Sequence, residues 1–229
     1  MMMDIFSTFD LGMTNFNTTF MWFSLFILPF LMNFMIWAVP NSFFFITSAP
    51  LQMMNEQLSR TNARHLKSMT LFISSIFISL MTLNLIGLIP YSFSVTSHLI
   101  FTLSIALPMW LSLIVSASVH APKMFLAHLL PAGAPDWLNP FLVLIETISM
   151  LVRPLTLAFR LAANMSAGHI VLSLIGIFSS SLIIMSPLTG SFIILAQMGY
   201  FMFEVAIGLI QSFIFCLLIS MYSDDHPTT

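Results

Sequence analysis

Charged residues are scarce in this sequence: Asp, Glu, Lys and Arg together make up only 6% of its 229 residues. Water-soluble domains carry about 25% charged residues, so this chain lacks the charge to cover a surface in water. Hydrophobic residues account for 59% of the chain. The composition therefore excludes a soluble domain and predicts an integral membrane protein.

Cysteine and basic residues are also too few for several common functions. Cys216 is the only cysteine, which excludes an internal disulfide and a multi-cysteine metal site. The 6 basic residues are outnumbered by 8 acidic ones and form no patch for nucleic acid. No glycine-rich phosphate loop with a lysine occurs, and the histidines lack metal-ligand spacing. We expect no nucleotide site, no metal and no cofactor.

The first 16 residues contain Asp4 and Asp10 but no Lys or Arg. They therefore lack the basic region of a signal peptide and the arginines of a mitochondrial presequence. We expect no removable targeting segment.

Long apolar runs predict an all-α membrane protein with about five transmembrane helices and one interfacial amphipathic segment, all within a single domain of residues 1–229. A span needs about 20 mainly apolar residues, and prolines and glycines divide the runs. The predicted segments are span 1 at 16–39, an interfacial segment and basic loop at 41–67, span 2 at 68–89, span 3 at 96–119, a long helix at 137–185 and a terminal helix at 191–222.

The last two runs are too long for upright spans. A helix over 137–185 would be roughly 70 Å long, against a hydrocarbon core of about 30 Å. Ser186, Pro187, Thr189 and Gly190 predict a turn before the terminal run. We therefore expect a hairpin of two long, strongly tilted helices.

The basic loop residues lie on one side of the predicted membrane. Arg60, Arg64 and Lys67 precede span 2, and Lys123 follows span 3. By the positive-inside rule this side is the cytoplasm or the mitochondrial matrix. The N-terminus is then outside and, after five crossings, the C-terminus is inside.

Four charged residues lie within the hairpin: Glu146, Arg153, Arg160 and Glu204. Charged side chains in a membrane are costly and usually face a bundle interior or a watery path. The first three recur every seven residues and share one helix face, with Asn164 one turn beyond Arg160. This pattern predicts an ion path.

A second polar stripe follows one face of the terminal helix and comprises Tyr200, Glu204, Gly208 and Gln211. Folding the hairpin at Pro187 brings Arg160 to the depth of Gln211 and His169 to the depth of Glu204. We therefore expect two polar levels at different depths in the membrane.

These residue types suit proton transfer along two separate paths. Carboxylic acids in poorly solvated sites and histidines exchange protons near neutral pH. The depths of these residues predict one proton path from the outside to Glu204 and His169, and a second path from the inside to Glu146. Arginine keeps its proton, so Arg160 would act as a fixed positive charge between the paths. With no unpaired carboxylate of this chain expected at its depth, its anionic partner is predicted on another subunit.

The segment from Arg160 to His169 reads RLAANMSAGH, with Glu146 upstream and Glu204 and Gln211 downstream. This pattern closely resembles subunit a of the F-type ATP synthases, and its animal mitochondrial form in particular. The resemblance covers essentially the whole chain in span order. It implies a non-catalytic, proton-translocating subunit of the mitochondrial inner membrane that couples proton movement to ATP synthesis.

The resemblance also implies residue roles. Arg160 would face the carboxylate of the rotating c-ring, with Asn164 and Gln211 beside it. His169 and Glu204 would line the half-channel from the intermembrane space.

On the opposite side, the resemblance implies that Glu146 belongs to the matrix half-channel. The N-terminus would lie in the intermembrane space and the C-terminus in the matrix. The implied partners are the c-ring, the peripheral stalk, other Fo subunits and membrane lipid. Roles for Arg153 and Tyr200 stay open, and Arg153 suits a structural position beside Pro154 equally well.

Other interpretations remain on the residues alone. A secondary transporter would show inverted repeats, and none is visible. A purely structural subunit leaves the four charges of the hairpin unexplained, although Glu204 and His169 would also suit a buried hydrogen-bonded pair that moves no protons. Sodium stays open as the coupling ion, but no cluster of oxygen ligands favours it over protons.

Overall fold

The computed structural model describes residues 42–61, 68–89, 94–128 and 136–224. The described helices are α2 (Ser42–Arg60), α3 (Met69–Gly87), α4 (Leu99–His120), α5 (Pro122–His128), α6 (Asn139–Met185) and α7 (Pro187–Asp224), with short 3-10 helices η4 (Val95–Ser97) and η5 (Asp136–Leu138). The predicted all-α class is confirmed. Predicted span 1, at 16–39, lies outside the described residues.

Four of the described helices are long and apolar enough to cross a membrane: α3, α4, α6 and α7. The first and last residues of these helices lie within a few positions of the bounds predicted for spans 2 and 3 and for the two long helices. Helix α2 occupies the first part of the predicted interfacial segment, and the basic loop that follows it, at 62–67, lies outside the described residues.

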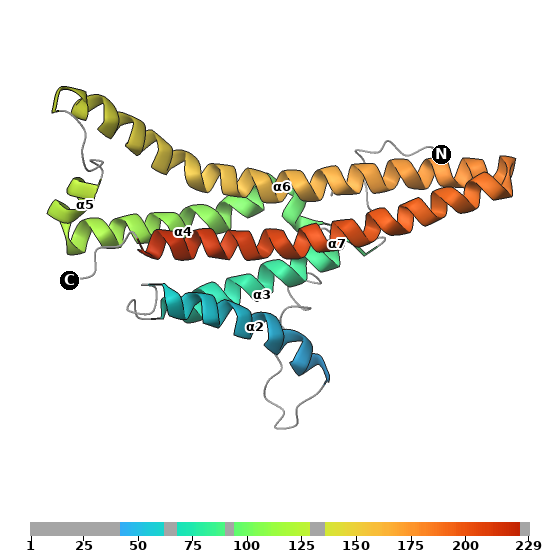
Figure 1. Cartoon of the computed structure of the whole chain (residues 1–229), viewed down its shortest axis with the longest axis horizontal. Coiled ribbons are helices and arrows are strands. Elements are labelled where there is room, and N and C mark those ends of the chain that lie inside the picture. The colour runs from blue at the N-terminus through green and yellow to red at the C-terminus, as the bar shows by residue number, and fades with distance from the viewer. Residues whose placement is uncertain (1–41, 62–67, 90–93, 129–135, 225–229) are drawn as a thin grey trace, which may run out of the picture.

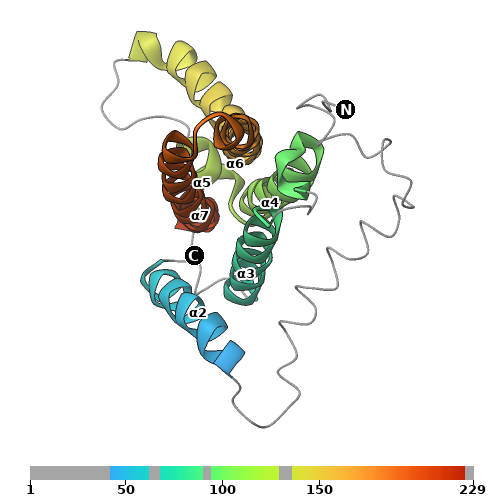
Figure 2. The same ribbon diagram turned by 90° about the vertical axis from the view of Figure 1, so that its right-hand side faces the viewer.

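Helices α6 and α7 form an antiparallel hairpin along the long axis of the molecule (Figure 1). Helices α3 and α4 lie beside the half of the hairpin that contains the C-terminal end of α7, and the tip of the hairpin extends beyond them. A view along the axis places α2 on the outside, next to α3 and α7 (Figure 2). Among the described helices, this covered half of the hairpin is the part that belongs to a helix bundle.

The connection between α6 and α7 is shorter than the predicted turn. Ser186 alone is extended between them, with φ −153° and ψ 114°, and Pro187 already begins α7. Proline suits the first position of a helix because its fixed φ is helical and an N–H there has no intrahelical partner. Residues expected to form a loop therefore form the first turn of α7.

A proline also explains the bend in α6. Pro154 lies inside this helix, where it removes one backbone hydrogen bond and its ring crowds the preceding turn. The N-terminal part of α6 turns away from the other helices (Figure 1). Glu146 lies on this departing part, and Arg153 immediately precedes the proline.

The core joins all five longer helices where the hairpin meets α3 and α4. Phe215 of α7 is 1% exposed, and Phe77 and Phe213 meet edge to face with ring centroids 6.4 Å apart. The buried members are Met54, Leu58, Ile73, Phe77, Leu80, Ala106, Met109, Leu113, Leu157, Ala158, Leu161, Phe215, Cys216 and Ile219. Because lipid is as apolar as these side chains, close packing rather than exclusion of water holds this core together.

Candidate functional site

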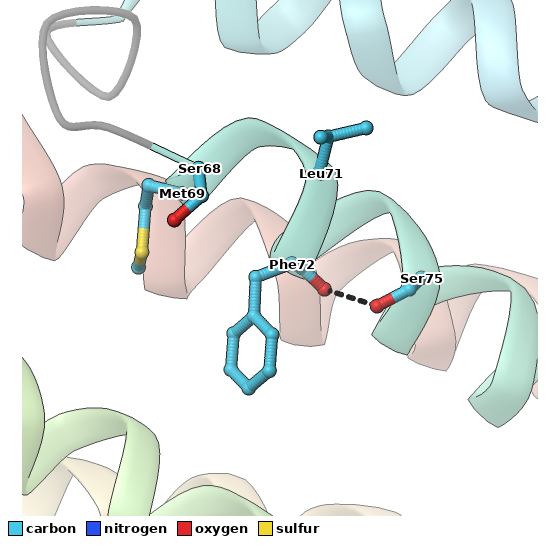
Figure 3. A pocket seen from close by; sticks show the side chains of 5 residues that line it. All are labelled: Ser68, Met69, Leu71, Phe72 and Ser75. Carbon is cyan, nitrogen blue, oxygen red and sulfur yellow. Dashed lines mark hydrogen bonds between the residues drawn. The ribbon is translucent and has the colours of Figure 1, made fainter.

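A cavity of about 420 Å³ lies at the start of α3 (Figure 3). Its lining residues are Ser68, Met69, Leu71, Phe72 and Ser75. The Ser75 hydroxyl donates a hydrogen bond to the backbone carbonyl of Phe72 at 2.8 Å. Among the residues that the structure describes, no charged side chain lines this cavity. The predicted polar residues meet elsewhere, between the helices, and the candidate site is therefore described there.

The first polar level is an amide pair between the two long helices. Asn164 Nδ2 on α6 donates to Gln211 Oε1 on α7 at 3.2 Å, and Gln211 is only 5% exposed. Gln211 therefore meets Asn164, one helical turn beyond its predicted partner Arg160. At this level the observed contact therefore differs by about one turn from the predicted depth match.

Arg160 lies one turn before Asn164 on α6, and its side chain is exposed. Among the residues that the structure describes, it makes no hydrogen bond or ion pair. The small residues Ala163 and Ala167 are exposed nearby, at helical spacings from Arg160. The described part of the chain thus leaves this cation without an anionic partner of its own.

The second polar level is centred on Glu204, which is 3% exposed although it lies within a membrane helix. Its carboxyl group packs directly against Gly168 of α6, where an added Cβ atom would overlap it. Tyr200, one turn earlier on α7, is hydrogen-bonded to Glu204. Glycine at 168 is therefore a steric requirement for this position of the carboxyl group.

His169 follows Gly168 and connects the same level to α3. It is hydrogen-bonded to the backbone of Gly87, at the C-terminal end of α3. The structure thus brings Glu204 to the residue next to His169, as the depth match predicted, while His169 itself contacts a third helix. Three helices meet at this level.

Asn84 of α3 is a buried polar residue that sequence reasoning missed. It is 0% exposed, and its Nδ2 donates to the backbone carbonyl of Gly208 at 3.1 Å. Gly208 lies between Glu204 and Gln211 on α7, so Asn84 attaches α3 between the two polar levels. The sequence contains a signal for this contact, because Asn84 is an amide within the apolar run of span 2, but an amide is not ionisable and so is not among the charged residues that predict the ion path.

The end of the hairpin opposite the α6–α7 connection holds a cluster of three residues. Arg153 Nη2 lies 3.4 Å from Glu146 Oε1, and both side chains are 38% exposed. The guanidinium carbon also lies 5.6 Å from the centre of the Tyr222 ring, near the C-terminal end of α7. Arg153, whose role the sequence left open, is therefore the partner of Glu146.

The two acidic residues lie on opposite sides of Arg160 along the hairpin. Glu146 precedes Arg160 by roughly 21 Å along α6, and Gly168, which marks the depth of Glu204, follows it by roughly 12 Å, at 1.5 Å per residue. In the described ranges, no three His, Cys, Asp or Glu side chains come together as metal ligands. The arrangement offers groups that can exchange protons at two depths, with a fixed cation between them.

Fold and site together define a multi-pass membrane protein in which titratable residues occupy two depths of a long helical hairpin. The family model described as ATP synthase A chain matches residues 13–224. The chain is 39% identical to ATP synthase subunit a of Locusta migratoria over 226 residues, covering 98% of this chain and 99% of the relative. The chain belongs to the ATP synthase subunit a family, in its animal mitochondrial form.

Other relatives agree with this assignment. ATP synthase subunit a of Aedes albopictus is 40% identical over 232 residues, covering 98% of this chain and 99% of the relative. ATP synthase F(0) complex subunit a of Rhopalosiphum padi is 35% identical over 224 residues, covering 97% and 99%. The resemblance inferred from the RLAANMSAGH segment is confirmed. Membership makes the chain a membrane subunit of the Fo sector, associated with proton transport and ATP synthesis.

Proposed function

We propose that the chain is the stator subunit that carries protons past the rotating c-ring of the mitochondrial ATP synthase. It forms two half-channels, and Arg160 separates them while facing a carboxylate of the ring. It has no nucleotide site of its own. Its N-terminus lies in the intermembrane space and its C-terminus in the matrix, as the distribution of basic loop residues favours.

The exposed side chain of Arg160 carries this proposal. A guanidinium within a membrane helix needs a counter-ion or water, because leaving it in hydrocarbon is costly. Within the described residues no carboxylate pairs with it, so the counter-ion comes from a neighbouring subunit. Exposed Ala163 and Ala167 allow a neighbouring helix to come close to the same region of α6. A c-ring helix with a mid-membrane carboxylate fits both requirements.

The outer half-channel ends at Glu204 and His169. The burial of Glu204 against Gly168 supports this assignment, because an ionisable group inside a membrane helix is costly and usually marks an ion path. A proton from the intermembrane space passes through this level and neutralises a ring carboxylate. The neutral ring site then leaves Arg160 and enters the lipid.

The inner half-channel begins at Glu146, on the part of α6 that turns away beyond Pro154. A ring carboxylate returning from the lipid releases its proton toward Glu146, and Arg160 then stabilises the anion that remains. The fixed charge of Arg160 opposes direct passage of protons between the two paths. Each proton that crosses can draw about 2.3 kcal/mol from every 100 mV of membrane potential.

Replacing Arg160 tests the proposal most directly. In the assembled complex reconstituted into vesicles, Arg160→Ala should lower potential-driven ATP synthesis by about 100-fold, the scale on which one preorganised charged or polar group acts. Passive proton conduction should rise at the same time, because the separating charge is gone. Arg60→Ala, at an exposed arginine of α2, is the matched control and should retain the wild-type rate. Wild-type coupled synthesis in Arg160→Ala would refute the separating role.

A further inference from the structure

Arg153 connects three parts of the inner end of the hairpin. Its guanidinium contacts the Glu146 carboxylate two helical turns earlier on α6, at 3.4 Å. It also lies over the Tyr222 ring of α7, at 5.6 Å from the ring centre. One side chain thus links an acidic residue of α6 to the last turns of the neighbouring helix.

The contact with Glu146 is unusual for a helix. Ion pairs along one helix normally join residues three or four positions apart, whereas these two are seven apart. Seven residues correspond to about 10.5 Å of helix rise, so both long side chains must extend toward each other. The rotamers of both residues are therefore held by the contact, and the carboxylate is confined to one region beside the helix.

Pro154 makes this confinement important. Because the helix bends at this proline, the part of α6 that carries Glu146 leaves the bundle and loses its packing against the other helices. Glu146 consequently has few neighbours that could fix its position, and its side chain is 38% exposed. Arg153 sits at the bend itself, where it can reach both the departing segment and α7.

We infer that Arg153 is a positioning residue for the inner proton path. It holds the Glu146 carboxylate at the bend of α6 and anchors it to the end of α7 through the Tyr222 ring. Arginine suits this role because its charge does not depend on pH, its planar group binds carboxylates, and it stacks on aromatic faces. This inference rests on the proposed function, since it assigns Arg153 an effect on proton release through Glu146.

A double-mutant cycle in the assembled complex tests the inference. Arg153→Met keeps a long side chain that suits a membrane environment and removes the charge. It should lower ATP synthesis per assembled complex by about tenfold, the scale on which outer partners that orient a functional group act. Arg153→Lys keeps the charge without the planar group and should lose less. In a Glu146→Gln background, Arg153→Met should cause no further loss, because the arginine acts through that carboxylate.

A purely structural role gives a different result. It predicts that less complex assembles in Arg153→Met and that the losses in ATP synthesis rate multiply in the double variant. Multiplied losses in the double variant, or a wild-type rate in Arg153→Met, would overturn the inference. If Glu146→Gln lowers the rate and Arg153→Met does not, only the role of Arg153 is refuted. If Glu146→Gln keeps the wild-type rate, the inner path of the proposed function fails, and the inference fails with it.

The contact with α7 is tested separately at Tyr222. Tyr222→Leu removes the aromatic face and should lower the rate by about two- to fivefold, in line with the strength of cation–π contacts at partly exposed sites. Tyr222→Phe keeps the ring and should lose less than Tyr222→Leu. Equal losses in the two variants would show that the ring face does not anchor Arg153.

Discussion

The two helices of the hairpin differ sharply in how far protein covers them. In the most apolar 18-residue stretch of α7, 39% of the residues are buried, compared with 11% in α6. Helix α7 packs against α6 and α3, and α6 packs against α7 and α4, but the N-terminal part of α6 leaves the bundle and the α6–α7 tip extends beyond it. Similar apolar sequences therefore occupy an interior position in one case and a boundary position in the other.

The polar residues follow the same division. Glu204 and Gln211 of α7 are 3% and 5% exposed, whereas Arg160 of α6 is exposed and the Glu146–Arg153 pair is 38% exposed. The polar groups of α7 are thus buried within this chain, whereas the charged side chains of α6 stay partly or fully exposed. Hydropathy alone does not separate these two roles. On α6, the charges of Glu146 and Arg153 pair with each other, whereas Arg160 has no anionic partner among the described residues.

The largest effect expected from this comparison is on stability. Phe215→Ala in α7 removes a side chain that is 1% exposed and should cost about 3–5 kcal/mol in the free energy of unfolding. Phe178→Ala in α6, where the ring is 61% exposed, should change it little. Denaturation of the purified complex containing each variant measures the difference. Equal losses would contradict the boundary position of α6.

A smaller effect is expected where the two helices touch. Gly168→Ala puts a methyl group into the volume of the Glu204 carboxyl, which must rotate away, at a cost of about 1–3 kcal/mol. The complex should still assemble, but proton entry should slow because the carboxyl no longer lies against α6. Proton flux measured as external pH is varied tests this expectation.

Gly199→Ala is the matched control for this change. No neighbouring heavy atom lies within 4 Å of a Cβ atom added at Gly199, so the variant should conduct protons like the wild type. If Gly168→Ala also conducts like the wild type, the position of Glu204 against α6 has no part in proton entry.

The smallest effect is expected at the contact between α3 and α7. Asn84→Leu keeps a similar volume but removes the donor to the Gly208 carbonyl, which should cost about 0.6 kcal/mol, the average for hydrogen bonds between membrane helices. Thermal denaturation should detect this loss, and Asn55→Leu, at an exposed site on α2, provides the comparison. A gain in stability in Asn84→Leu would mean that the amide is retained for something other than attaching α3 to α7.

The sequence predicted the long helices well because their limits depend on local chemistry. The predicted 137–185 compares with the observed Asn139–Met185, since Pro140 falls in the first turn, where a helix tolerates proline, and Ser186 is extended after the last residue. The predicted start of the terminal helix is less accurate, because the sequence pattern assigns Pro187 to a turn and the structure shows that it begins α7.

Contacts between helices were predictable only to within about one turn. Depth matching brought Glu204 to the level of His169, and the structure places Glu204 against the adjacent Gly168. It paired Gln211 with Arg160, whereas Gln211 contacts Asn164. The bond from Asn84 to Gly208 depends on how α3 crosses α7, and helix periodicity within one segment carries no information about that crossing.

The single extended residue at Ser186 has a mechanical consequence for the whole hairpin. With no slack between α6 and α7 at this end, neither helix can slide along the other without distorting a helix terminus. A sideways load applied to the exposed face of α6 is therefore shared by α7 and α4, which pack against α6, and through α7 by α3. The stator role proposed above, which requires resistance to torque from a turning ring, would depend on this kind of stiffness.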